Sequence, residues 1–191
     1  VDRGGSQSYY YGAPTDFTSS DGQAGDFDIN NFPESQAGGS FVQWAPGKDR
    51  RVDPVLLDMV DQIARRFGRP LTITSGYRSP SHNRKVGGAK GSQHMKGKAV
   101  DISGGGLSNQ DRLDLIAIAS SVGVKGIGVY NGGSLHFDNR DGARAGWGSS
   151  YSYPSVPSYA KATIDKHLAG GFKQVPRLPP SGGGGGGGTP V

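Results

Sequence analysis

The stretch GSQHMKGKAVDIS, residues 91–103, places His94 and Asp101 seven positions apart among glycines and other small residues. A third polar residue, His136, follows within SLHFDN, residues 134–139. Two imidazoles and one carboxylate are ligands that suit zinc, and three protein ligands leave a fourth position for water, as in a catalytic site. The same residues could instead form hydrogen-bonded structural pairs, and their spacing alone leaves both interpretations open.

The composition limits the chemistry of such a site. The chain has no cysteine, which excludes thiolate ligands, thiolate nucleophiles and disulfides. A metal site must therefore be built from carboxylates and from some of the four histidines, which are His82, His94, His136 and His167.

The charge balance indicates anionic partners. The chain carries 21 basic and 16 acidic residues, a formal net charge of +5, which favours bacterial cell wall, nucleic acid or anionic lipid. The basic residues are dispersed and do not interleave with aromatics as in nucleic-acid-binding modules, so nucleic acid is not an expected partner. No apolar stretch approaches the roughly eighteen residues of a membrane span. The first residues, VDRGGSQSYYYG, have no apolar core, so we expect a processed product or a piece of a longer protein rather than a signal peptide.

The elements that must position these residues can be read from caps and periodicity. Asp53 and Pro54 predict a helix start, and Gly68 predicts its end. A second helix is expected from Ser108, which forms a capping box with Asp111, to Gly123. The remaining expected elements are strands at 71–75, 98–103, 126–130 and 134–139, a brief helix opening at Ser79 and Pro80, and a last helix at 159–168. This mixture predicts an α+β fold with a small, mostly antiparallel sheet and flanking helices.

Composition divides the chain into four parts. We expect an extended flexible arm at 1–38, a folded domain at 39–150, a helix and packing segment at 151–172, and a Pro/Gly-rich linker or tail at 173–191. Trp147 is expected to pack over the end of the sheet or to line a cleft, and His167 to be exposed on the last helix.

The motifs SGYRSPSHN (75–83), SQHMKGKAVD (92–101) and GIGVYNGGSLHFDNR (126–140) together resemble the zinc peptidases of family M15, the D-Ala-D-Ala carboxypeptidase family. They look like the branch of peptidoglycan hydrolases found in bacteria and in phage lysins, and the resemblance covers about residues 40–147. It implies the fold shared with hedgehog-type domains and one zinc ion held by His94, Asp101 and His136.

The resemblance also implies residues that act on the substrate. Arg78 stands where the family keeps an arginine facing the substrate, and a guanidinium can stabilise a developing oxyanion. Tyr77 lies in the same loop and Ser92 opens the SxHxxGxAxD string, and both are expected to contact the substrate. A surface arginine in a loop is the plainer interpretation of Arg78.

The sequence departs from many relatives at the general base. Those relatives carry a Glu or Asp three residues before the last zinc histidine, where this chain has Gly133. Asp138 is the nearest carboxylate, and strand alternation puts it on the face of His136. Asp138 could be the catalytic base, or it could orient a zinc ligand or Arg140.

The sequence therefore predicts a zinc-dependent peptidase that hydrolyses peptide bonds in the stem peptides or cross-links of bacterial peptidoglycan. We expect a phage virion-associated lysin or endolysin, acting on the host wall from the periplasmic or outer side, with tails that could contact other virion proteins. A secreted bacterial enzyme is the less favoured setting. The alternative is a catalytically inactive, zinc-containing structural or wall-binding module of a virion.

Overall fold

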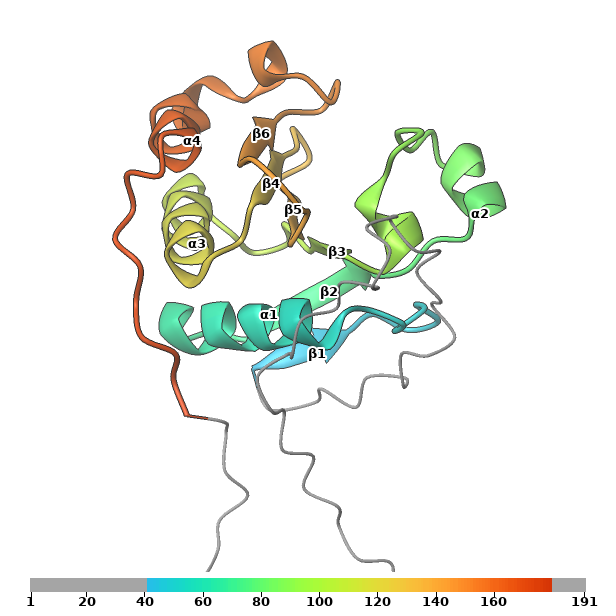
Figure 1. Cartoon of the computed structure of the whole chain (residues 1–191), viewed down its shortest axis with the longest axis horizontal. Coiled ribbons are helices and arrows are strands. Elements are labelled where there is room, and N and C mark those ends of the chain that lie inside the picture. The colour runs from blue at the N-terminus through green and yellow to red at the C-terminus, as the bar shows by residue number, and fades with distance from the viewer. Residues whose placement is uncertain (1–40, 180–191) are drawn as a thin grey trace, which may run out of the picture.

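The computed structural model describes residues 41–179. The predicted arm at 1–38 and the end of the predicted tail lie outside these residues. The described part is an α+β fold, as predicted, in which one six-stranded sheet is packed against helices (Figure 1). The bounds of the four expected domains remain a prediction.

The sheet has the strand order β1-β2-β3-β5-β4-β6. Its three central pairings, β2–β3, β3–β5 and β5–β4, are antiparallel, and the two edge pairings are parallel. The strands are β1 (Val42–Trp44), β2 (Leu71–Ser75), β3 (Ala99–Ile102), β4 (Gly126–Val129), β5 (Leu135–Asp138) and β6 (Ala145–Trp147). The four central strands confirm the sequence prediction, whereas β1 and β6, of three residues each, show too little periodicity to be predicted.

The two long helices form where the caps predict them. Helix α1 (Pro54–Phe67) begins after Asp53, whose side chain accepts a hydrogen bond from the amide of Val55, and ends at Gly68, which has a φ of 77°. Helix α3 (Asn109–Val122) begins with the predicted capping box of Ser108 and Asp111. The two helices pack against each other and lie on one side of the sheet (Figure 1). Their apolar sides and one face of the sheet make the core.

Shorter elements lie around this core. The brief helix predicted from Ser79 and Pro80 is α2 (Pro80–Lys85), and a 3-10 turn, η2 (Gln93–Lys96), follows it. Two further 3-10 turns, η3 (Tyr153–Ser155) and η4 (Ser158–Ala160), lead into α4 (Lys161–Leu168), which packs on α3 and β6.

One expectation about the C-terminal part needs correction. His167 is fully buried, because α4 turns it towards α3, where its Nδ1 lies 2.9 Å from Ser120 Oγ and its Nε2 donates to the carbonyl of Lys125. Residues 173–179, assigned from composition to the tail, lie along α1. Gln62 makes two hydrogen bonds with the backbone of Leu178, and Arg177 pairs with Asp58.

Candidate metal centre

Strand pairing brings two of the predicted ligands together. Asp101 on β3 lies directly opposite His136 on β5, so the two side chains share one face of the sheet. Their strand neighbours Val100, Ile102 and Phe137 point to the other face and are completely buried in the core. Because side chains alternate between the two faces of a strand, one face of β3 and β5 packs in the core and the other carries Asp101 and His136.

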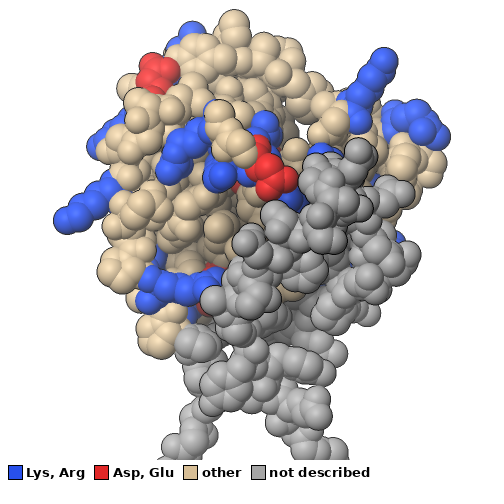
Figure 2. All heavy atoms as spheres, in the orientation of Figure 1, with Lys and Arg blue, Asp and Glu red and all other residues tan. Residues whose placement is uncertain are grey.

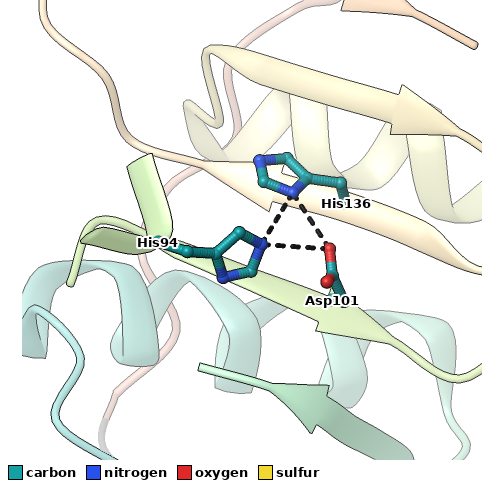
Figure 3. Close-up of side chains that lie close together, drawn as sticks. All are labelled: His94, Asp101 and His136. Atoms are coloured by element: carbon teal, nitrogen blue, oxygen red, sulfur yellow. Dashed lines mark hydrogen bonds and ion pairs between the residues drawn. The ribbon is translucent and has the colours of Figure 1, made fainter. Parts of the chain in front are cut away.

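The third predicted ligand, His94, comes from η2 rather than from the sheet. Ser92 caps this turn by accepting a hydrogen bond from the amide of His94, and Gly97 ends it with a φ of 66°. A left-handed residue at this point is easiest for glycine, and it lets the chain turn from η2 into β3. His94 is buried at 2% exposure and reaches over the sheet to Asp101 and His136 (Figure 3).

Three donor atoms converge between these residues (Figure 3). His94 Nε2 lies 3.2 Å from Asp101 Oδ1 and 3.2 Å from His136 Nδ1, and the last two atoms are 3.0 Å apart. In a tetrahedral zinc site with bonds of about 2.0–2.2 Å, neighbouring ligand atoms lie about 3.3 Å apart. The three residues therefore fit a zinc ion by both donor type and spacing. Among residues 41–179, they are the one group of His, Cys, Asp or Glu side chains that could hold a metal ion.

The opposite nitrogens of both rings are held by hydrogen bonds that fix the tautomers. His94 Nδ1 donates to the carbonyl of Gly76 at 2.6 Å, and His136 Nε2 donates to Asp138 Oδ2 at 3.0 Å. Each ring then presents an unprotonated nitrogen to the centre. Hydrogen bonds of this kind orient metal-binding histidines and raise their basicity.

The charge state of the carboxylate also suits a cation. Burial alone would raise the pKa of Asp101, but the side chains of His136 and His94 beside its oxygen lower the pKa well below the usual range. Asp101 is therefore ionised at neutral pH. Its side chain keeps 14% exposure, so the centre is not sealed from solvent on this side.

Arg78 lies at the site, where it contacts the carboxylate. Its Nη2 pairs with Asp101 Oδ2, and its Nε donates to Ser75 Oγ at 2.9 Å. The guanidinium thus holds the carboxylate oxygen that faces away from the two histidines. Contact with a substrate, which the resemblance implies, stays a prediction and would use the remaining nitrogen, Nη1.

The two other predicted substrate contacts have structural partners. Tyr77 stacks under Arg51, whose guanidinium carbon lies 4.6 Å from the ring centroid. Ser92 is the cap of η2, so its hydroxyl oxygen is engaged with the His94 amide. Neither contact tests the predicted role in substrate binding.

The geometry around Asp138 supports an orienting role rather than that of a catalytic base. Asp138 lies on the face of His136, as alternation predicts, but its side chain is completely buried. One oxygen binds His136 and Arg140 Nη2, and the other binds the Nε and the amide of Arg140. Burial raises its pKa, but the hydrogen bonds to Arg140 and His136 lower it well below the usual range. A carboxylate with both oxygens occupied, on the far side of the imidazole, is poorly placed to take a proton at the centre.

Two aromatic residues lie near the centre: Trp147, which was expected to pack over the end of the sheet or to line a cleft, and Tyr130, for which no role was predicted. Trp147 pairs through β6 with Gly128, and its ring centroid lies 5.1 Å from that of His136. The glycine is required there, because a Cβ on Gly128 would lie 2.8 Å from the indole nitrogen. Tyr130 follows β4 on the same face. The signal that could have found Tyr130 is its even spacing from Gly128 in a strand opposite the HxD strand.

An α+β fold in which two histidines and one aspartate converge at one point offers a site that could hold a metal ion. The sequence model of the family described as Peptidase M15 matches residues 25–138, and the chain belongs to this peptidase family. The search of curated proteins gave no significant match. In the part of the chain that the structure describes, no helix is long and apolar enough to cross a membrane.

Proposed function

We propose that this protein is a zinc-dependent peptidase that hydrolyses peptide bonds in the stem peptides or cross-links of bacterial peptidoglycan. The observation that carries the proposal is the convergence of His94, Asp101 and His136. Hydrogen bonds hold both imidazoles in the tautomer whose unprotonated nitrogen points to the centre. Membership in peptidase family M15 supports the same class of reaction.

The residues of the chain have separable roles in this mechanism. When bound, zinc polarises the scissile carbonyl and lowers the pKa of a bound water to about 7. His94, Asp101 and His136 would hold the ion. Asp138 and the carbonyl of Gly76 fix the two imidazoles, and Arg78 fixes Asp101.

Peptidoglycan as the substrate rests on the resemblance to the branch of hydrolases that act on it. The charge of the chain supports this choice, since stem peptides carry free carboxylates and the net charge is +5. On the described part of the visible face, Lys and Arg side chains are scattered rather than gathered in one strip (Figure 2). A phage setting, as a virion-associated lysin or an endolysin, is part of the proposal because that branch includes phage lysins.

The test is digestion of purified peptidoglycan with and without a chelator, with mass spectrometry of the released fragments. We expect release that the chelator abolishes and added zinc restores. His94→Ala should be inactive, and His82→Ala, which changes an exposed histidine on α2, should be fully active. The fragment masses then distinguish a carboxypeptidase from an endopeptidase.

Absence of release from a protein that holds one zinc per chain would overturn the peptidoglycan peptidase. It would favour the inactive zinc-containing structural or wall-binding module, for which the engaged state of Asp138 is the supporting observation.

A further inference from the structure

A row of residues crosses the sheet at the level of the metal centre. Asp101 pairs with His136, His136 with Gly128, and Gly128 with Trp147. Residues paired across strands point to the same face, so the indole of Trp147 lies on the face that carries the ligands. The contact between the rings of His136 and Trp147 confirms this arrangement.

Tyr130 lies on the same face of the sheet, two residues after Gly128. Its amide donates to the carbonyl of Ser134 at 3.1 Å, which continues the β4–β5 ladder by one residue beyond Val129. Being two residues after Gly128, its side chain points to the face of His136. Tyr130 is partly buried.

The charges of the centre act on the Tyr130 phenol. Burial, and after it the negative charge of Asp101, raise its pKa to about 12, while the neighbouring indole N–H of Trp147 and the charge of Arg78 act in the opposite direction. A phenol is protonated at neutral pH even without such a shift. Tyr130 is therefore a hydrogen-bond donor beside the centre.

The indole nitrogen of Trp147 is a second donor at this place. It is buried and makes no hydrogen bond to any residue between 41 and 179. A buried donor without a partner is uncommon in a folded protein and calls for an explanation, such as a functional role. The indole lies over Gly128 and next to His136, and it is near enough to the Tyr130 phenol to lower the pKa of that phenol.

Most of the other polar atoms around the centre are engaged, apart from Nη1 of Arg78. Arg78 uses Nε and Nη2 on Ser75 and Asp101, and Asp138 is occupied on both oxygens. Hydrolysis of a peptide bond places negative charge on the carbonyl oxygen, and a fixed hydrogen-bond donor at that oxygen is among the largest contributions to the rate.

We propose that Tyr130 is a catalytic residue, whose hydroxyl, placed beside the Trp147 indole, donates a hydrogen bond to the scissile carbonyl oxygen as that oxygen becomes negative. Tyr130 keeps its proton throughout, and no covalent bond to it forms or breaks. The proposal deepens the proposed peptidase function and rests on it.

The test is Tyr130→Phe, which removes the hydroxyl and keeps the ring. The matched control is Tyr159→Phe, which alters a partly buried tyrosine packed against the core. Turnover is measured on a synthetic stem peptide that carries the bond identified by the digestion. We expect kcat to fall about 10²–10³-fold in Tyr130→Phe, the loss found for one oxyanion donor, with KM, zinc content and melting temperature close to wild type. Tyr159→Phe should keep the wild-type kcat.

Binding of a phosphinate analogue of the same peptide separates a catalytic from a packing role. The tetrahedral analogue should bind Tyr130→Phe about 10²–10³-fold more weakly, whereas the uncleaved product peptide should bind equally to both proteins. Wild-type kcat in Tyr130→Phe, or a loss of activity that follows a loss of zinc, would overturn the role of Tyr130 and leave the peptidase intact. A wild-type protein without chelator-sensitive turnover would overturn both.

Discussion

Replacement of Asp138 by Asn distinguishes the two roles open to this carboxylate. The side chain is completely buried, accepts the Nε2 proton of His136 at 3.0 Å, and pairs with Arg140 at 2.6 Å. An amide has the same shape but no charge. When its oxygen faces His136 and Arg140 Nη2, its NH2 group faces the Nε and the amide of Arg140, which are also donors. His136 would then be held less firmly, and its nitrogen facing the centre would be a weaker ligand.

The size of the effect follows from this position. Loss of a carboxylate that orients a metal-binding histidine lowers metal affinity about 10–100-fold, which corresponds to about 1.4–2.7 kcal/mol of binding free energy. We expect that loss in Asp138→Asn, and we expect saturating zinc to restore most of the turnover. The assay is competition for zinc against a chromophoric chelator, followed by turnover at saturating zinc. Asp141→Asn is the matched control, because this carboxylate lies three residues further on and is 90% exposed.

One result would refute this reasoning. If Asp138→Asn bound zinc as tightly as the wild type but showed no turnover at saturating zinc, Asp138 would be the catalytic base. Its pairing with Arg140 would then have to break during the reaction. Equal zinc affinity with full turnover would show that Asp138 orients nothing.

The remaining predictions concern parts of the fold away from the centre. Burial lowers the pKa of His167, and so does Arg144, whose Nη1 lies 3.2 Å from the ring. The contribution of the neutral His167 side chain to the free energy of unfolding is complete above the unfolded pKa of about 6.5. It is lost as the pH falls towards the folded pKa. The difference in unfolding free energy between wild type and His167→Gln should therefore shrink between pH 8 and pH 5 in urea titrations, and a constant difference would contradict it. Gln62→Ala removes both hydrogen bonds to Leu178, so we expect a cost of about 1–2 kcal/mol and faster tryptic cleavage after Lys173 and Arg177. The control is Gln110→Ala, which changes an exposed residue of α3, and trypsin should cleave this variant at the wild-type rate.

Local signals in the sequence predicted the central elements because local contacts decide them. The N-caps of α1 and α3 are made by Asp53 and Ser108 with residues two or three positions away, and Gly68 and Gly123 end the helices in left-handed conformations. The strands that carry Asp101 and His136 could be predicted from short apolar runs bounded by turns. Short edge strands such as β1 and β6 depend on partners far along the chain, and no local pattern predicts them.

The convergence of His94, Asp101 and His136 could be predicted, but the contacts of their neighbours could not. Alternation placed Asp138 correctly on the face of His136, yet it does not tell which ring nitrogen the carboxylate meets. Tyr130 and Trp147 reach the centre only through the registers of β4 with β5 and with β6. His167 did carry a signal, because Ile164 lies three residues before it on the same side of α4 and is also completely buried.

The three ligands differ in what holds them, and this bears on how the centre assembles. Asp101 and His136 are fixed by the β3–β5 ladder, whose core residues Val100 and Phe137 are completely buried. Their spacing is therefore set by the packing of the sheet and needs no ion. His94 stands on a short 3-10 turn and depends on the Ser92 cap and on the carbonyl of Gly76. Donor distances in a zinc site tolerate only about 0.2 Å, so changes in the 76–97 segment, rather than in the sheet, are the ones that most readily disturb the centre while leaving the fold intact.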